Sequence, residues 1–326
     1  MEFIIKETES SQRIDKFLKR ALKDAPVSFI YRMFRQKDVK VNGVKAKIDY
    51  LLKEGDHVSV YLKEDLLQQF RKQAVLRPVK PDFDILYEDE NILVADKPKG
   101  LLVHAEEGEK SITLQNMVLN YLAKKGEFDI NDPTGFLPSP AHRLDRNTSG
   151  IVLFGKNLLS LNELIRLFRE RKDLEKKYTL LVCGRIKRDG TIDFPLKKDP
   201  KTHIVKVTTL RDGGKEAHTV YHRLKAFNAG YYLVAAELLT GRTHQLRVHF
   251  AYIGNPIVGD AKYGDFEVND FFKRMYSYRN QFLHASYFRF KESLRKGPLS
   301  YLAGKEFISP LPKKEIEIID SIKRID

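Results

Sequence analysis

The sequence contains a single cysteine and no apolar run long enough to cross a membrane. Cys183 cannot form an internal disulfide and falls in the apolar run 180–183, which predicts a core position and a reducing compartment. No stretch approaches the roughly 18 to 20 consecutive apolar residues of a spanning helix. Residues 1–6 also lack the basic start and the longer apolar segment of a signal peptide. We therefore expect a cytoplasmic protein without a membrane partner.

Acidic residues are fewer than basic residues in this sequence. The 326 residues include 44 Asp and Glu against 58 Lys and Arg, which gives a formal net charge of +14. Because the cations are spread along the chain and not gathered in one tail, the pattern is typical of a folded protein that binds a polyanion. Nucleic acid is therefore favoured as the partner, and the length allows about two domains.

Signatures of common cofactors are also missing. Residues 97–100, Lys-Pro-Lys-Gly, match no phosphate-binding loop of nucleotide-binding proteins. His244 and His249 are five residues apart, which is off the i, i+4 spacing that places two ligands on one helix face, and no zinc-protease motif accompanies them. We expect no metal, nucleotide or redox cofactor, and we expect a monomer.

The first 62 residues have the pattern of a small α+β unit. Apolar residues at positions 14, 17, 18, 21 and 22 form one helical face, and Ser28 is expected to cap a second helix. Asn42-Gly43 joins two short strand-like runs, and this dipeptide is a strong hairpin signal because both residues tolerate positive φ. Residues 63–82 lack an apolar period and carry two prolines, which predicts a linker before a second domain over residues 83–326.

This N-terminal unit resembles the small RNA-binding module first named from ribosomal protein S-four, over roughly residues 11–62. In that family the two helices offer basic side chains to RNA phosphates, which provide affinity and position but no sequence selectivity. A solvated basic surface is the alternative for any single residue. The resemblance implies RNA contacts by Arg13, Lys16, Arg32, Arg35, Lys37 and Lys40.

One carboxylate, Asp145, lies between two arginines just before a predicted buried strand. Residues 142–150 read His-Arg-Leu-Asp-Arg-Asn-Thr-Ser-Gly and lead into the apolar run 151–154, which two glycines bound. Neighbouring guanidinium groups favour an ionised carboxylate, and an ionised carboxylate suits nucleophilic attack better than general-acid work. A structural ion pair that fixes a turn explains the loop equally well.

A second charged motif spans residues 241–254. Thr243 is a plausible cap and Gly254 a plausible end, so the pattern predicts a helix of about three turns. Arg247 lies one turn beyond the cap, and a solvated helix charge is its simplest interpretation. Tyr178 stands near the start of the predicted strand 176–184, where a tyrosine is usually a packing residue.

Taken together, these motifs resemble the RluA family of RNA pseudouridine synthases. The motifs at 142–150 and 241–249 occur with Lys177-Tyr178, with Asp-Lys-Pro-Lys-Gly at 96–100 and with Phe-Leu-His-Ala at 282–285, in family order over nearly the whole chain. With the N-terminal unit attached, the layout is similar to the RluC-type branch. Asn147 is a mild departure, because many members carry Asp at that position.

The resemblance implies isomerisation of uridine to pseudouridine in RNA, in which the base is cut from its nitrogen link to ribose and rejoined through carbon five. Asp145 matches the nucleophile or essential carboxylate, and Arg247 matches its ion-pair partner. Tyr178 matches the tyrosine that stacks on the base and is the candidate to remove the carbon-five proton. Arg143 matches the residue that fills the gap left by the flipped nucleotide. Cleavage of a glycosidic bond does call for a carboxylate at the anomeric centre.

The implied fold is α+β, with a mixed, mostly antiparallel, bifurcated sheet and the cleft between its two halves. The implied substrate is large-subunit rRNA or an assembly intermediate of it, although related enzymes modify tRNA or mRNA with the same motifs. Two other classes stay open at this point. One is a catalytically silent RNA-binding protein, and the other is an RNA glycosidase or nuclease, which would need a paired base or a metal set that the sequence lacks.

Overall fold

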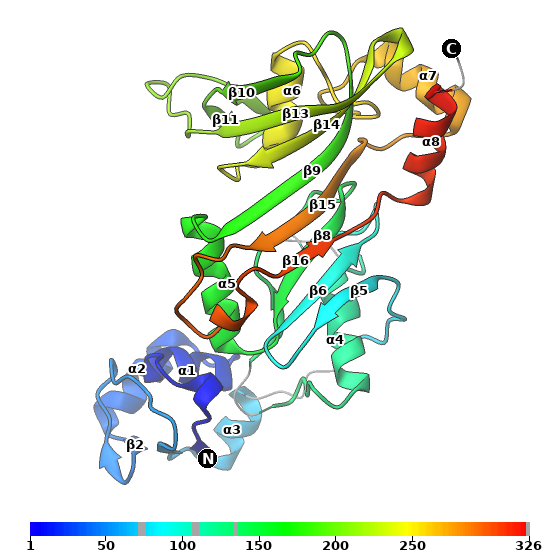
Figure 1. Cartoon of the computed structure of the whole chain (residues 1–326). Coiled ribbons are helices and arrows are strands. Elements are labelled where there is room, and N and C mark those ends of the chain that lie inside the picture. The colour runs from blue at the N-terminus through cyan, green and yellow to red at the C-terminus, as the bar shows by residue number, and fades with distance from the viewer. Residues whose placement is uncertain (71–75, 106–110, 133–135, 324–326) are drawn as a thin grey trace.

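The computed structural model describes residues 1–70, 76–105, 111–132 and 136–323 (Figure 1). The N-terminal unit packs helices α1 (Ile14–Ala21) and α2 (Val27–Gln36) on a small antiparallel sheet of order β1-β4-β2-β3. Its strands are β1 (Glu2–Ile4), β2 (Val39–Val41), β3 (Val44–Lys45) and β4 (His57–Val60), and the 3-10 turn η1 (Glu7–Glu9) lies between β1 and α1.

The predicted apolar face of α1 and the predicted hairpin are both confirmed. Ile14, Phe17 and Leu18 are fully buried in the core of this unit. Asn42 and Gly43 have φ of 50° and 78° between β2 and β3, as a tight hairpin turn requires. The predicted cap at Ser28 is wrong, because Pro26 holds the N-cap position of α2. Its ring fixes a φ that suits a helix start and removes an N–H that the first turn leaves unpaired.

A helix lies within the segment predicted as a linker. α3 (Glu64–Phe70) follows β4, and Phe70 is buried in the N-terminal core, with its ring centroid 4.6 Å from that of Phe29. Charged and amide residues dominate this segment, so its apolar contacts leave little trace in the sequence. We propose that the first domain extends to Phe70 and that the linker is shorter than residues 63–82.

The larger domain is built on one long sheet of order β10-β13-β14-β9-β15-β8-β6-β5, with β7 on β8 and β16 on β15 (Figure 1). Adjacent strands are antiparallel except β8 and β15, which are parallel. The predicted fold class, a mixed and mostly antiparallel sheet with helices, is therefore confirmed. The bounds are β5 (Asp84–Glu88), β6 (Ile92–Lys97), β7 (Ser139–Pro140), β8 (Ser149–Gly155), β9 (Leu174–Cys183), β10 (Asp189–Asp193), β13 (His218–Phe227), β14 (Tyr231–Leu238), β15 (Leu283–Phe290) and β16 (Glu306–Ile308).

Helices cover both faces of the sheet because the strands at its middle are apolar on both sides. Alternate residues of a strand point to opposite faces. On β8, Val152 and Phe154 join the cluster that includes α4 (Leu114–Lys124), while Ile151 and Leu153 join the cluster that includes α5 (Leu158–Glu170). All seven residues of β8 are buried, which confirms the predicted strand.

The remaining elements surround the half of the sheet that holds β9, β13 and β14. They are the hairpin of β11 (Leu196–Lys198) and β12 (Val205–Val207), and the helices α6 (Gln245–Tyr252), α7 (Phe266–Tyr276) and α8 (Lys313–Lys323). Short 3-10 turns, η2 (Asn228–Gly230) and η3 (Ser300–Leu302), precede β14 and β16. Cys183 is buried in the core of this half, as predicted. Across the described part of the chain, no helix combines the length and the apolar character of a membrane span.

Candidate active site

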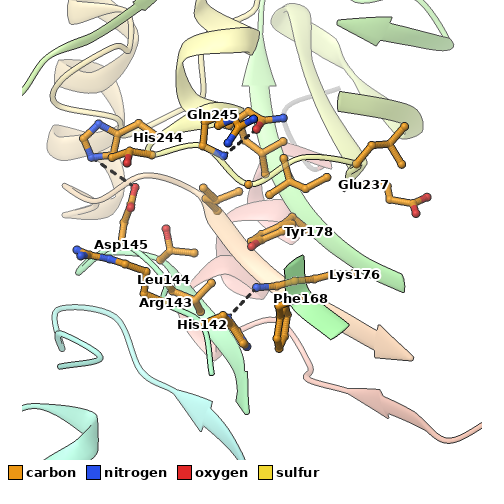
Figure 2. Close-up of a pocket in the computed structure, with 18 of the residues that line it drawn as sticks. His142, Arg143, Leu144, Asp145, Phe168, Lys176, Tyr178, Glu237, His244 and Gln245 are labelled. Carbon is orange, nitrogen blue, oxygen red and sulfur yellow. Dashed lines mark hydrogen bonds and ion pairs between the residues drawn. The ribbon is translucent and has the colours of Figure 1, made fainter. Parts of the chain in front are cut away.

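A cavity of about 410 Å³ opens between the loop that precedes β8, the first half of β9 and the start of α6 (Figure 2). This volume is in the range of small-molecule pockets. His142, Asp145, Tyr178 and Arg247 all line it, so residues from distant parts of the chain meet around one space. Figure 2 shows Asp145 on one side of this space, and Tyr178 enters it from β9 on the other.

Asp145 accepts a hydrogen bond from Nη1 of Arg247 at 2.9 Å, although the two residues are 102 positions apart in the chain. Two further nitrogens of the same guanidinium, Nε and Nη2, donate to the two oxygens of Asp260 at 2.7 and 2.8 Å. Asp260 is buried, whereas the side chain of Asp145 keeps 26% of its exposure. The guanidinium is thus fixed by a buried carboxylate on one edge and presents the other edge to a carboxylate that a ligand can reach.

The interpretation of Arg247 as a solvated helix charge is wrong, since only 8% of the residue is exposed. Burial alone would lower the pKa of Arg247, but Asp260 and then Asp145 outweigh burial and raise it. A guanidinium between two carboxylates therefore stays charged at every physiological pH.

The predicted cap of the Arg247 helix at Thr243 is also wrong. His244 holds the N-cap position of α6 with a φ of 54°, and its Nδ1 lies 2.9 Å from the hydroxyl of Tyr263. The side chain of Gln245 closes the turn, because its oxygen accepts from the main-chain N–H of Arg242 at 3.0 Å. His244 Nε2 lies 3.9 Å from Asp145, so this turn brings a second nitrogen group toward the carboxylate.

Tyr178 lies on β9 with its ring almost wholly buried, at 5% exposure. Burial raises the pKa of its phenol, and the negative charge of Asp145 adds to the increase. The hydroxyl therefore stays protonated near neutral pH. The ammonium of Lys176, two residues earlier on the same strand face, lies 5.0 Å from the centre of the Tyr178 ring.

Arg143 is exposed and lines the cavity beside Asp145 (Figure 2). The six basic residues expected to contact RNA from the N-terminal unit do not line this cavity. Five of them are exposed and Lys40 is half-buried. Three of them make local contacts. Arg13 pairs with Asp15 at 2.9 Å, the Arg32 guanidinium lies 4.8 Å from the ring centre of Phe29, and Lys40 Nζ lies 4.9 Å from that of Tyr61.

Lys97 does not line the cavity but supports the loop that carries Asp145, a role that was missed from the sequence. It is fully buried, and its ammonium donates to the main-chain oxygens of Pro98, Leu101 and Arg146 at 2.9, 2.7 and 3.0 Å. Burial lowers the pKa of Lys97 to about 7, against the opposing charge of Asp145. By holding the oxygen of Arg146, Lys97 anchors the main chain directly after Asp145. The signal in the sequence was the position of Lys97 within the family-like motif at residues 96–100.

Asp260, His244, Lys176 and Arg171 also escaped the sequence reasoning. Asp260 follows the apolar pair 257–258 and a glycine, a weak signal of a turn after a buried segment. Nothing local marks Lys176 or Arg171, which lie among other lysines and arginines. Their importance follows from the cavity that they line.

A buried polar chain supports the loop from below. His284 on β15 lies 2.9 Å from the hydroxyl of Ser149, at the first residue of β8, and its other ring nitrogen lies 3.0 Å from the main-chain oxygen of Ser309. The hydroxyl of Ser309 donates to Asp96 at 2.7 Å. This chain links β6, β8, β15 and the segment after β16, so it fixes the base of the loop that carries Asp145.

Comparisons with known proteins identify the family of the chain. The family model described as RNA pseudouridylate synthase matches residues 91–252, and the model of the S4 domain matches residues 12–58. The chain is 35% identical to the uncharacterized RNA pseudouridine synthase YlyB of Bacillus subtilis over 98% of its own length and 96% of that protein. It is 34% identical to ribosomal large subunit pseudouridine synthase C of Vibrio vulnificus, with 98% and 95% covered.

A solved structure, the human RNA pseudouridylate synthase domain containing 4, has the same fold. It superposes with a TM-score of 0.56 at 23% identity, covering 73% of this chain and 92% of the human chain. The full-length relatives and the matched models therefore agree on one conclusion. The chain belongs to the RluA-type family of RNA pseudouridine synthases, enzymes that isomerise uridine in RNA, and it carries an N-terminal S4 domain.

Proposed function

We propose that the protein converts uridines of large-subunit rRNA to pseudouridine, with Asp145 as the essential carboxylate. The observation that carries the assignment of Asp145 is its position, since it lines a nucleotide-sized cavity opposite Tyr178 and accepts a hydrogen bond from the buried Arg247. The rRNA target is supported by the relatives named ribosomal large subunit pseudouridine synthase C and by the basic S4 domain.

Asp145 acts at the sugar. The bond between ribose C1′ and base N1 breaks, and a new bond forms between C1′ and C5 of the same base. The carboxylate stabilises or traps the electron-poor sugar while the base turns. Arg247, held by Asp260, keeps the carboxylate oriented through this step.

Tyr178 acts on the base. Its ring lies in the cavity wall, where a uracil can stack against it. Once C5 is bonded to C1′, its proton must leave and a proton must return to N1, so the product is an isomer and no water is consumed. Tyr178 is positioned for this transfer, because its ring lines the cavity. The neutral phenol gives its proton to N1 of the base, and the resulting phenolate, a strong base because burial raises its pKa, then accepts the C5 proton.

The target base must leave its stack to reach this cavity, at a cost of a few kcal/mol. We propose that the Arg143 side chain fills the gap that the flipped base leaves in the RNA, because Arg143 is exposed and lines the cavity. The exposed S4 cations supply backbone affinity that offsets the cost of flipping. We infer that the protein acts as a monomer in the cytoplasm, where rRNA is assembled.

The test measures two products in one reaction. Large-subunit rRNA from a strain that lacks the gene is incubated with the native protein or with Asp145→Asn, and pseudouridines and chain breaks are mapped. We expect pseudouridine at discrete sites with the native protein alone and chain breaks with neither. Chain cleavage would point to a nuclease. If both proteins bound the rRNA equally and neither formed pseudouridine, the result would point to a catalytically silent RNA-binding protein.

A further inference from the structure

Two basic side chains that the proposed catalytic steps do not use, Arg171 and Lys176, also line the cavity. Lys176, Arg171 and His142 line it together with Phe168 and Lys291. Lys176 Nζ lies 3.2 Å from Nδ1 of His142, and Figure 2 shows the lysine side chain reaching into the cavity below Tyr178. This cationic wall, defined as Arg171 and Lys176, takes no part in the steps assigned to Asp145, Tyr178 and Arg247.

Among the residues that the structure describes, neither cation of this wall has a carboxylate partner. Arg171 donates to the main-chain oxygen of Leu238 at 3.1 Å, and Lys176 contacts the neutral ring of His142 and the face of Tyr178. Within the described ranges of the chain, no carboxylate forms an ion pair with either of them. Buried or half-buried charges are ordinarily paired. Two adjacent unpaired cations in a cavity are therefore a site for an anion that arrives with the ligand.

The fold holds Arg171 at this wall despite a local cost. Arg171 ends α5 with a φ of 60°, a left-handed conformation that usually falls to glycine at a helix end. Its guanidinium occupies the space beside Gly241 in which a Cβ would lie. Backbone strain at a cavity wall favours a functional role for the strained residue. Burial, reinforced by Arg171, lowers the pKa of Lys176 to about 7, and a bound anion would restore its charge.

We infer that the cationic wall binds a phosphate group adjacent to the target uridine, so that one nucleotide is held by its base at Tyr178, its sugar at Asp145 and its phosphate at Arg171 and Lys176. This inference rests on the proposed function. A phosphodiester presents the anionic oxygens that guanidinium and ammonium groups bind best. The wall thus positions the sugar relative to Asp145, and Arg171 and Lys176 are binding residues.

The experiment needs no knowledge of the target site in rRNA. Binding of uridine, uridine 5′-monophosphate and uridine 3′-monophosphate to the full-length protein is measured by titration calorimetry at constant ionic strength and pH 6.5. We expect one of the two monophosphates to bind roughly tenfold more tightly than uridine, and inorganic phosphate to compete with it. The arm that gains affinity identifies the side of the uridine on which the phosphate lies.

Three variants locate the effect. Lys176→Met and Arg171→Met should each reduce the monophosphate advantage to about threefold or less, while Lys172→Met should keep it. Lys172 is a suitable control because it neighbours Arg171, is 68% exposed and lies outside the cavity lining. Melting temperatures by circular dichroism identify any variant that fails to fold. The binding of uridine and its two monophosphates to the native protein tests the inference even if a variant does not fold.

The outcomes separate this inference from the proposed function. If the native protein forms pseudouridine in rRNA but binds uridine as tightly as both monophosphates, the phosphate site is refuted and the function stands. The same holds if Lys176→Met and Arg171→Met fold and keep the full advantage. If the native protein forms no pseudouridine, the proposed function itself fails, whichever ligand binds.

Discussion

Asp260 binds Arg247 through both carboxylate oxygens and so directs the remaining guanidinium nitrogen at Asp145. The same Asp260 oxygen that accepts from Nη2 also accepts from the main-chain N–H groups of Lys262 and Tyr263, at 2.9 and 3.1 Å. A bidentate pair fixes the plane of a guanidinium. Asp260 is thus a positioning residue that acts on Asp145 through Arg247.

Replacing Asp260 tests this relationship. Asp260→Asn keeps the size of the side chain but turns one acceptor toward Arg247 into a donor, so the guanidinium must rotate. We expect kcat to fall about 10- to 100-fold with KM within about threefold, because a small displacement of a catalytic group has costs of this order. Multiple-turnover assays on rRNA measure both. Asp265→Asn removes a charge at the start of α7, while the amide oxygen can still cap the helix, so it should keep kcat. An unchanged kcat in Asp260→Asn would refute the role.

Tyr178→Phe separates stacking from proton transfer. The ring remains, so RNA affinity should stay within about threefold, while loss of the hydroxyl should lower kcat by about 10²- to 10⁴-fold, the usual contribution of a general base. Release of tritium from carbon five of labelled uridine follows the step directly. Tyr178→Leu should lose affinity as well. Full tritium release by Tyr178→Phe would assign the proton transfer to another group.

Lys176 predicts a specific pH dependence of stability. Its folded-state pKa is lowered to about 7 by burial, whereas an unfolded lysine titrates near 10.4. Below pH 7 the charge is buried and its cost is fully present. Between pH 7 and about 10 the unfolded chain binds more protons than the folded chain, so the free energy of unfolding rises with pH.

We therefore expect Lys176→Met to raise the melting temperature most below pH 7, with the gain shrinking as pH rises toward 10. Thermal unfolding followed by circular dichroism gives the difference from the native protein at each pH. Lys172→Met is the exposed control and should show no such trend. A difference for Lys176→Met that stays constant from pH 6 to pH 10 would contradict the prediction.

Gly150 begins the apolar part of β8 at a φ of 107°, and a Cβ there would overlap the main chain of Ala285 on β15. Gly126 also has a positive φ, but nothing lies within 4 Å of its Cβ position. Gly126→Ala should cost about 1 kcal/mol of unfolding free energy from backbone strain alone. Gly150→Ala should cost about 3 kcal/mol or more, because β15 must move. Urea unfolding of the two variants checks the ranking.

The basic residues of the S4 domain predict how RNA affinity depends on salt concentration. Arg32→Met and Arg35→Met should each weaken RNA binding to a similar extent for all sequences, and each should reduce the slope of log affinity against log salt by about one. Filter binding across a salt series measures this slope. Lys314→Met, on α8 beside Glu317, should leave the slope unchanged. Loss of affinity without a change of slope would argue against phosphate contacts.

The sequence predicted those parts of the fold that short-range patterns determine. The apolar run 151–154 between glycines could only be a buried element, and β8 is one. The hairpin at Asn42-Gly43 follows from φ preferences alone.

The rest depended on contacts between distant positions. Burial of Arg247 is stable only because carboxylates at positions 145 and 260 meet it, and no local pattern encodes that meeting. The caps at Ser28 and Thr243 were wrong because a neighbouring proline and a histidine contact to Tyr263 determined those turns instead. The roles of Asp145, Tyr178 and Arg247 came from the family resemblance, and they stay predictions until the variants are assayed.

The parallel pairing at the middle of the sheet has a consequence for how the enzyme fails. The ladder between β8 and β15 consists of two residue pairs, His284 with Ser149 and Ala285 with Gly150. Asp145 lies in the loop before β8, on one side of this short pairing, while β9 and α6 lie on the other side. A mild denaturant that disrupts the pairing of β8 with β15 would separate Asp145 from β9 and α6 and abolish catalysis. The other strand pairs in each half of the sheet would stay formed, so inactivation would precede global unfolding.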